Sequence, residues 1–397
     1  MNQAKRNVAL LVFCQALAMT SMTVLITVAA LAGSALVSNK ALATLPLALM
    51  QLAVMLATIP ASLLMKRYGR RLGFMVGASI GMVGGGLGAI AIIAASFPLF
   101  CTALILIGVF NGFAGYYRFA AADAADDAFR PQAISLVVAG GVIAALVGPG
   151  LATVSKDWFS DAQYAGTLVA VVLLQVPTLF LLTRVQIPPI PVAERKLKGR
   201  SLSVILQQPV FVVAAVSSMV GYGIMALLMT ATPLAMVAIP HPFEAAASVI
   251  QWHVLGMFAP SFATGFLIAR FGVLTILLWG VFLNFLCISF NLWGTSVLHF
   301  HIALTLLGVG WNFMFVSATT LLTTAYVPAE KAKTQAAHDF LMFAFVALCT
   351  YLSGEILNRF GWATLNYVAL PPLGLALGAV LWLMTQRQKM LSSQNLP

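Results

Sequence analysis

Long apolar segments recur along nearly the whole chain, and only short polar connections separate them. A helix needs roughly 20 consecutive apolar residues to cross the hydrocarbon core of a bilayer. Cutting the chain at charges, prolines and glycines predicts twelve spans, with ends uncertain by about four residues. They fall at about 8–33, 41–65, 72–96, 98–121, 131–154, 163–184, 207–237, 244–269, 272–291, 297–325, 332–357 and 362–385. An outer-membrane barrel is excluded, because its strands alternate polar and apolar residues. We therefore expect an all-α polytopic membrane protein.

The composition excludes a large soluble domain. Of the 397 residues, 61% are hydrophobic and 8% are charged, whereas soluble domains carry about 25% charged residues. The net charge of +11 would suggest nucleic acid in a soluble protein. Here, however, seventeen Lys and Arg residues lie on the side of the N-terminus and three on the other. This bias predicts cytoplasmic termini and no nucleic-acid partner.

A proline- and charge-rich connection divides the spans into six and six. It predicts an N-terminal bundle at 1–184, a cytoplasmic linker at 185–205 and a C-terminal bundle at 206–397. An internal repeat supports the division, since Arg67 and Arg270 are 203 positions apart, as are Gly69 and Gly272. The four cysteines are isolated in apolar runs, so we interpret them as buried hydrophobes.

The loop Ser62-Leu-Leu-Met-Lys-Arg-Tyr-Gly-Arg-Arg71 resembles the loop motif G-x-L-a-D-R-x-G-R-R of the major facilitator superfamily. The sequence from Gly140 to Gly150 resembles a further motif of that superfamily. Ser62 and Lys66 depart from the loop pattern, which has Gly and Asp there. The resemblance implies a major facilitator fold of two six-helix bundles and transport by alternating access around a midplane site.

Two pairs of soft ligands occur in adjacent predicted spans. Met225 and Met229 are four residues apart, as are His253 and Met257, so each pair lies on one helical face. Thioethers select Cu(I), and imidazole is a good additional ligand. Because the chain has seventeen Met residues, core packing is the alternative interpretation for each pair.

The same two pairs resemble the copper-binding motifs of the CcoA-like (CalT) copper importers of the superfamily. This resemblance implies import of copper, expected as Cu(I), across the bacterial inner membrane for haem–copper oxidase assembly. The implied metal ligands are Met225, Met229, His253 and Met257. Copper is then the transported substrate rather than a cofactor, and a cytoplasmic copper acceptor and the lipid bilayer are the expected partners. Met236, His241, His299 and His301 near outer loops are either ligands that first sample the copper or solvated residues.

Other polar residues within or beside the spans are candidates for gating, coupling or lining the cavity. Arg118 and Asp123 are expected either to form an ion pair at a gate or to reach the interface separately. Asp339, beside His338, and Glu355 are expected either to titrate during transport or to be solvated. The gating and coupling candidates are Arg67, Gly69, Arg118, Asp123, Asp339 and Glu355, and the cavity candidates are Gln15, Asn111, Trp311 and Asn312.

Several alternatives to copper import stay open. Relatives in the same wider family carry organic solutes such as riboflavin, and the Gly–Pro motif of the fifth span is found in drug exporters. A receptor role would give binding without flux. An enzyme is not expected, because the sequence has no nucleophile–base pair and no phosphate-binding loop. The sequence does not fix the coupling ion.

Overall fold

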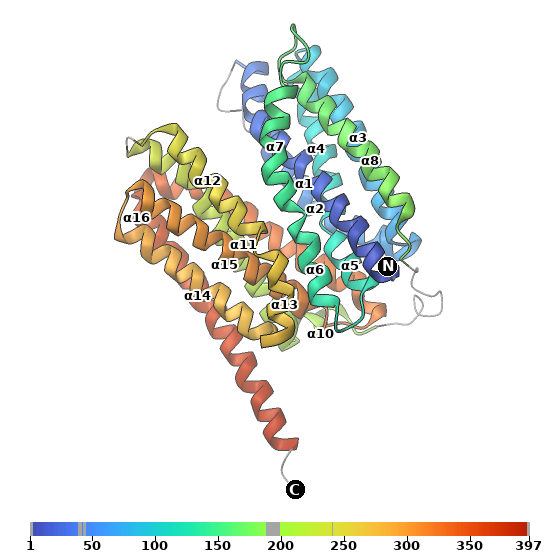
Figure 1. Ribbon diagram of the computed structural model, residues 1–397, viewed down its shortest axis with the longest axis vertical. Helices are drawn as coiled ribbons and strands as arrows, with labels where there is room; N and C mark the ends of the chain where they lie inside the picture. The colour runs from blue at the N-terminus through green and yellow to red at the C-terminus, as the bar shows by residue number, and fades with distance from the viewer. Residues whose placement is uncertain (1–2, 39–41, 43–44, 188–198, 240, 395–397) are drawn as a thin grey trace. The chain divides into compact units, whose positions relative to one another are not determined.

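The computed structural model describes residues 3–38, 42, 45–187, 199–239 and 241–394, and all regular structure in these ranges is helical (Figure 1). Eleven helices are long and apolar enough to cross a membrane, and a bent pair of helices supplies a twelfth candidate span. The predicted all-α fold with twelve spans is therefore confirmed.

The first six spans are built from eight helices, because two of the spans are interrupted. Gly115 and Tyr116 separate α4 from α5 within the span 97–124, and Gly140 separates α6 from α7 within the span 130–155. The helices are α1 (Gln3–Leu36), α2 (Leu45–Tyr68), α3 (Arg70–Ile93), α4 (Phe97–Ala114), α5 (Tyr117–Ala124), α6 (Arg130–Ala139), α7 (Gly141–Ser155) and α8 (Ala165–Arg184).

The last six spans contain one sharp bend and one break. The sequence predicts the eighth span as a continuous stretch, but it is bent by 41° between α12 and α13, where Pro260 has no N–H to continue the ladder. In α16 a non-helical φ of 81° at Gly361 separates the last two spans. The elements are α10 (Leu202–Leu206), α11 (Pro209–Ala238), α12 (Phe243–Phe258), α13 (Ser261–Phe271), α14 (Val273–Trp293), α15 (Val297–Leu322), the 3₁₀ helix η2 (Pro328–Glu330) and α16 (Lys331–Gln394).

The chain forms two compact units. The first unit comprises Met1–Leu197 and Gln335–Phe340, and the second comprises Lys198–Thr334 and Leu341–Pro397. A short piece of α16 thus belongs to the first unit, which the sequence did not indicate. Residues 188–198 of the predicted linker lie outside the described residues, and the predicted domain boundaries stay a prediction.

The two repeated loops have the same backbone conformation. Gly69, immediately before α3, has φ 91° and ψ 159°, and Gly272, immediately before α14, has φ 86° and ψ 150°. Side-chain-bearing residues rarely adopt this region, so both turns require glycine. The sequence repeat is therefore also a structural repeat.

Both units expose apolar side chains over their outer surfaces. Leu146 and Val154 of α7 and Phe262 and Phe266 of α13 are each more than half exposed. Soluble proteins do not expose apolar residues so extensively, whereas lipid tails solvate them at no cost. Inside, α3 packs against α4 and α8, and α15 packs against α11, α12 and α14. The protein is therefore a multi-pass membrane protein, and α15 is the central helix of the second unit.

Candidate functional site

The predicted copper ligands lie on two helices that are in contact, α11 and α12. Met225 and Met257 are buried, Met229 is half-buried, and His253 has no exposed surface. The Nδ1 atom of His253 lies 2.8 Å from the carbonyl oxygen of Leu304 on α15. Its Nε2 atom is buried and has no hydrogen-bond partner among the described residues. One nitrogen of His253 is therefore unused.

A glycine on α15 allows this arrangement. A Cβ atom at Gly308 would collide with the carbonyl oxygen of His253 and would lie 2.8 Å from the amide nitrogen of Met257. Because Gly308 has no side chain, α12 and α15 approach closely and the imidazole reaches the Leu304 carbonyl. The position of His253 is thus fixed by backbone contact.

The grouping of Met225, Met229, His253 and Met257 around one metal ion stays a prediction. In the part of the chain that the structure describes, the two pairs lie on neighbouring helices. Within the same ranges, no three His, Cys, Asp or Glu side chains are placed to hold a metal ion. The four cysteines are free, and three of them are buried, as predicted for small apolar residues.

Asn312 is expected from the sequence to line the cavity, but it holds the bend between α12 and α13. It is fully buried on α15, and its amide nitrogen donates to the carbonyl of Met257 at 2.6 Å and to the hydroxyl of Ser261. Its amide oxygen accepts a hydrogen bond from Thr264 at 2.7 Å. The bend at Pro260 interrupts the helical ladder, and the Asn312 side chain bonds to groups on both sides of it. Asn312 therefore has a structural role at the bend, and its predicted cavity role stays a prediction.

Trp311 belongs to a group of five rings in the second unit. We call Tyr222, Phe258, Trp311, Phe315 and Phe343 the aromatic cluster; they come from α11, α12, α15 and α16. Trp311 and Phe315 are stacked, with centroids 4.8 Å apart and planes at 11°. Tyr222 presents its ring nearly perpendicular to both, with centroids 5.5 and 5.9 Å away. Phe258 contacts Trp311 edge to face at 5.9 Å, and Phe343 lies 6.1 Å from Tyr222.

Within the aromatic cluster, only Trp311 is a candidate that the sequence indicated. The i, i+4 spacing of Trp311 and Phe315 was a usable signal for a shared helical face. No pattern in the local sequence indicated that rings from the other three helices would join Trp311 and Phe315. The indole Nε1 of Trp311 is buried and has no acceptor among the described residues, so the cluster contains an unused hydrogen-bond donor.

The ion pairs of the first unit differ from the predicted pair of Arg118 and Asp123. Arg118, on α5, binds Asp339 with a nitrogen–oxygen distance of 2.6 Å, although the residues are 221 positions apart. Asp123 binds Arg70 at 3.1 Å. Proximity in sequence suggested the Arg118–Asp123 pair, but the folded helices bring each residue to a partner on another helix.

Asp339 and His338 are buried, which contradicts the solvated alternative for Asp339. Asp339 is 1% exposed, and its Oδ1 atom lies 2.9 Å from Nδ1 of His338. Arg70 donates at 2.7 Å to Gln335, which lies one helical turn before Asp339 on α16. We call Arg70, Arg118, Asp123, His338 and Asp339 the charge cluster. Buried charges are stable when they are paired, and each of these ion pairs joins opposite charges. The Oδ2 atom of Asp339 has no hydrogen-bond partner among the described residues.

The remaining predicted residues have other contacts. Glu355 pairs with Arg359 at 2.8 Å, and both side chains are substantially exposed, which fits the solvated interpretation. Arg67 is exposed and lies over the ring of Tyr68. Asn111 donates to the sulfur of Met22 at 3.3 Å, which joins α4 to α1. Gln15 is half-buried on α1.

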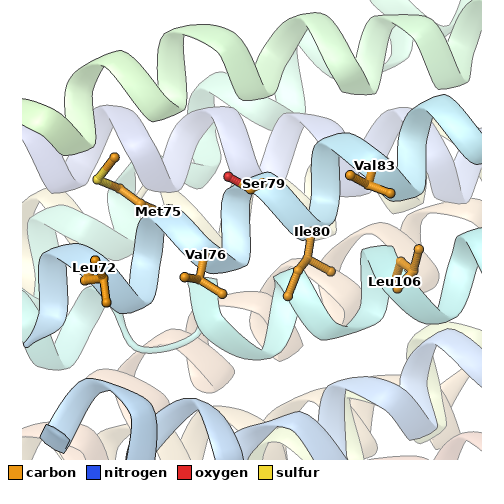
Figure 2. Close-up of a pocket in the computed structure, with 7 residues that line it drawn as sticks. All are labelled: Leu72, Met75, Val76, Ser79, Ile80, Val83 and Leu106. Carbon is orange, nitrogen blue, oxygen red and sulfur yellow. The ribbon is translucent and has the colours of Figure 1, made fainter. Parts of the chain in front are cut away.

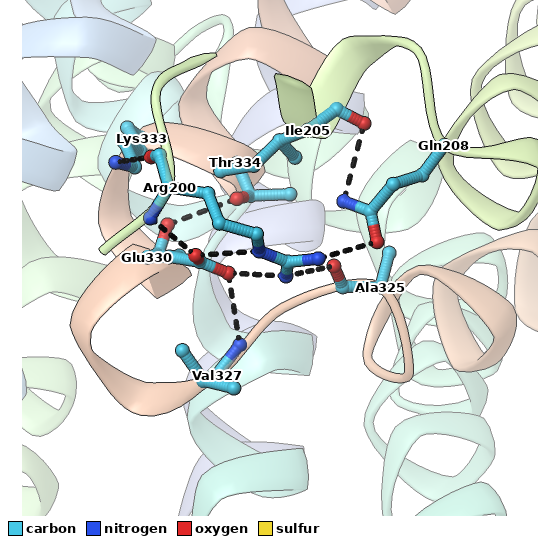
Figure 3. A network of polar contacts seen from close by, with 8 residues as sticks. All are labelled: Arg200, Ile205, Gln208, Ala325, Val327, Glu330, Lys333 and Thr334. Atoms are coloured by element: carbon cyan, nitrogen blue, oxygen red, sulfur yellow. Dashed lines mark hydrogen bonds and ion pairs between the residues drawn. The ribbon is translucent and has the colours of Figure 1, made fainter. Parts of the chain in front are cut away.

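A polar network ties residue 200 to the beginning of α16 in the second unit (Figure 3). Glu330 accepts hydrogen bonds from the backbone nitrogen of Arg200 at 2.7 Å and from its Nε atom at 2.8 Å. Arg200 also donates to Gln208 at 2.9 Å, and Lys333 donates to the carbonyl of Arg200. The hydrogen bond to Glu330 raises the pKa of Arg200 above its usual value. This network anchors the end of the linker and does not resemble a cargo site.

A shallow groove on α3 and α4 has no chemistry for binding a polar cargo (Figure 2). It is lined by Leu72, Met75, Val76, Ser79, Ile80, Val83 and Leu106. Leu72, Val76 and Val83 are exposed, as expected for a face against lipid tails.

Comparisons with known proteins place the chain among transporters. A model of the Major Facilitator Superfamily matches residues 11–248. The Riboflavin transporter RfnT of Brucella anthropi is 41% identical over 377 residues, which cover 94% of each chain. The uncharacterized MFS-type transporter YdeG of Bacillus subtilis is 30% identical and covers 86% of this chain and 84% of its own.

Solved structures support the fold. The transporter FucP in its outward conformation superposes with a TM-score of 0.76 over 94% of this chain and 98% of its own, at 15% identity. A bacterial homologue of the iron transporter ferroportin superposes with a TM-score of 0.77 over 96% of this chain and 99% of its own, at 13% identity. At such low identity these likenesses establish the fold alone. The relatives fit the organic-solute alternative better than the copper hypothesis, because the relative of 41% identity is a riboflavin transporter.

Proposed function

This chain belongs to the major facilitator superfamily, and from that premise we propose that it imports riboflavin across the bacterial cytoplasmic membrane. The observation that carries the proposal is the 41% identity to a riboflavin transporter over 94% of both chains. Fold alone would not indicate a substrate, because the superfamily hosts many. An identity of this size over the whole length includes the helices that contact cargo.

The chemistry of the second unit supports this substrate. Riboflavin is uncharged and combines a planar aromatic ring with a polyhydroxyl chain. Among the buried polar side chains that the structure describes in this unit, Glu330 is the one carboxylate, and Arg200 pairs with it. The rest are Ser, Thr and Asn side chains together with His253. An interior of this kind can hydrogen-bond a neutral solute without desolvating a fixed charge.

Transport proceeds by alternating access, in which the binding residues open first to one side of the membrane and then to the other. The charge cluster supplies the groups that can gate or couple this cycle, since Asp339 contacts both Arg118 and His338. The orientation follows the positive-inside bias, with both termini in the cytoplasm.

Copper import is a second candidate, and the unused Nε2 of His253 favours it. Buried imidazole nitrogens are normally bonded, and thioethers with imidazole form a site for Cu(I). On this hypothesis, replacing Met229 or His253 with Ala abolishes copper accumulation and leaves folded protein in the membrane.

The two candidates are tested with the purified full chain in liposomes. Riboflavin uptake is followed by its fluorescence, and uptake of radioactive copper, kept reduced, is followed in parallel. We expect saturable riboflavin flux above that of protein-free liposomes and no copper flux. Copper flux that is lost in His253→Ala, without riboflavin flux, would overturn the proposal and establish the alternative. The same assay at several pH gradients identifies proton coupling.

A further inference from the structure

The geometry points to the aromatic cluster as the binding platform for the planar ring of the cargo. We infer that the isoalloxazine ring of riboflavin stacks on the aromatic cluster and that the indole N–H of Trp311 donates a hydrogen bond to an acceptor atom of that ring. This inference rests on the proposed function, because it assigns residues to the recognition of the same substrate.

The ring arrangement suits a flat aromatic guest. Trp311 and Phe315 have parallel planes, at 11°, while Tyr222 stands at 78° and 84° to them. Two stacked rings cover one face of each other and present their outer faces to a further ring, and perpendicular rings direct their electropositive edges toward a neighbouring face. A three-ring heterocycle can use both kinds of contact. Four helices contribute to the aromatic cluster, so its shape is set by the packing of the whole unit.

The unpaired donor of Trp311 is the second, independent observation. Trp311 is 3% exposed, and its Nε1 atom has no hydrogen-bond acceptor within the part of the chain that the structure describes. Buried indole N–H groups normally find a partner. The side-chain oxygen of the neighbouring Asn312 accepts from Thr264 and does not bond the indole. An acceptor on a bound molecule would satisfy the indole.

Two rings of the aromatic cluster keep some exposed surface. Phe258, Trp311 and Phe315 are buried, but Tyr222 and Phe343 are only half-buried. A ligand can therefore reach the buried rings by displacing or sliding between the two half-buried ones. In a cluster that served only to fill the core, all of the rings would be buried, and no buried N–H group would be left unpaired.

The predicted copper ligands stand beside this platform. Met225 and Met229 follow Tyr222 at i+3 and i+7 on α11, and Met257 precedes Phe258 on α12. Residues three, four and seven apart share a helical face, and thioethers make favourable contacts with aromatic rings. The Met residues that suggested a metal site are thus also suited to line an aromatic one.

The test compares Trp311→Phe, which keeps a ring and removes the N–H group, with Trp279→Phe as a matched control. Trp279 is half exposed on α14 and lies outside the aromatic cluster. The dissociation constants for riboflavin and for lumiflavin, which keeps the ring and lacks the ribityl chain, are measured on the purified full chain by flavin fluorescence quenching. We expect Trp311→Phe to raise both constants by about five- to tenfold, the value of one lost hydrogen bond. Trp279→Phe should change neither constant.

A second variant, Phe315→Leu, removes the stacking partner and keeps an apolar side chain. It should also weaken both flavins, by about three- to tenfold. Gel filtration and thermal unfolding establish that each variant is folded. In competition with riboflavin, lumiflavin should displace it and ribitol should not.

The two hypotheses fail in different ways. If the wild-type protein neither binds nor transports riboflavin, the proposed function is overturned and this inference with it. If the wild-type protein transports riboflavin while Trp311→Phe and Phe315→Leu bind it with unchanged affinity, only the inference is overturned. Displacement by ribitol and not by lumiflavin would also overturn it, because the chain rather than the ring would then be recognised.

Discussion

The two units keep different kinds of polar groups in their interiors. The first unit buries charges, in the ion pairs of Arg118 with Asp339 and of Arg70 with Asp123. The second unit buries mainly amides, hydroxyls and aromatic rings, with Asn312 and Trp311 on its central helix. The repeated loops at Gly69 and Gly272 show that the two halves nevertheless share an ancestral plan.

This difference suggests that the two units contribute to transport in different ways. Charged groups change their interactions strongly when a proton or a partner is lost, so they suit gating and coupling. Neutral donors and rings recognise an uncharged solute without a desolvation penalty for ions. We therefore expect substitutions in the first unit to act through charge and those in the second to act through hydrogen bonding and shape.

The largest effect is expected from breaking the most buried ion pair. Arg118→Met removes the arginine from the buried carboxylate of Asp339 and leaves the contact with His338, which should lower the free energy of unfolding by about 3–5 kcal/mol. The measurement is unfolding of the purified protein in detergent. The double variant Arg118→Met/Asp339→Asn should recover most of the loss, because the neutral amide needs no cation. A single variant as stable as the wild type would show that the Arg118–Asp339 pair does not stabilise the folded protein.

A smaller loss is expected in the second unit from Asn312→Leu. The leucine leaves the Met257 carbonyl and the Thr264 hydroxyl without their amide partner, which should cost about 2–4 kcal/mol. The half-buried Asn111, which donates to the sulfur of Met22, provides the control. Asn111→Leu should cost less than about 1 kcal/mol. Equal losses from the two variants would argue against Asn312 as the residue that holds the bend.

The repeated glycines should behave alike in the two units. Gly69→Ala and Gly272→Ala each place a side chain at positive φ, and each should lower the stability by about 1–3 kcal/mol. Gly86, inside α3, is the matched control, because a Cβ atom there would have no neighbouring atom within 4 Å. Gly86→Ala should be neutral or stabilise by about 0.5–1 kcal/mol, because alanine favours the helix. If only one of the two loop variants loses stability, the turn requires glycine in one unit and not in the other.

The smallest effect is expected from an ion pair outside the charge cluster. Glu355→Gln removes the exposed i, i+4 pair with Arg359, and such pairs contribute about 0.3–0.5 kcal/mol. Unfolding and riboflavin uptake should both stay close to wild-type values at every pH tested. A pH-dependent loss of uptake in this variant would assign proton coupling to Glu355.

Local patterns predicted the spans, and tertiary contacts decided the site. Runs of apolar residues and the Lys and Arg bias are properties of consecutive residues, so the twelve spans could be predicted with ends accurate to a few residues. Asp339 was placed near an interface because its helix begins close by, but its burial depends on Arg118, far away in sequence. Asn312 was assigned to a cavity because it is a polar residue within a span. Its contacts with the bend at Pro260 could not be predicted, because that bend lies on another helix and has no signal in α15 itself. The aromatic cluster escaped notice because its rings come from four helices.

The first unit cannot be completed during biosynthesis until the six residues Gln335–Phe340 have been made. The ribosome delivers the chain from the N-terminus, and domains generally fold as units in that order. The partner of Arg118, however, is made 221 positions later, so most of the 397 residues must be synthesised before the first unit is complete. Until then this arginine has to be held by water, lipid headgroups or the insertion machinery. A gene cut at the linker would therefore yield an N-terminal fragment that needs the C-terminal fragment in the same membrane to reach its final structure.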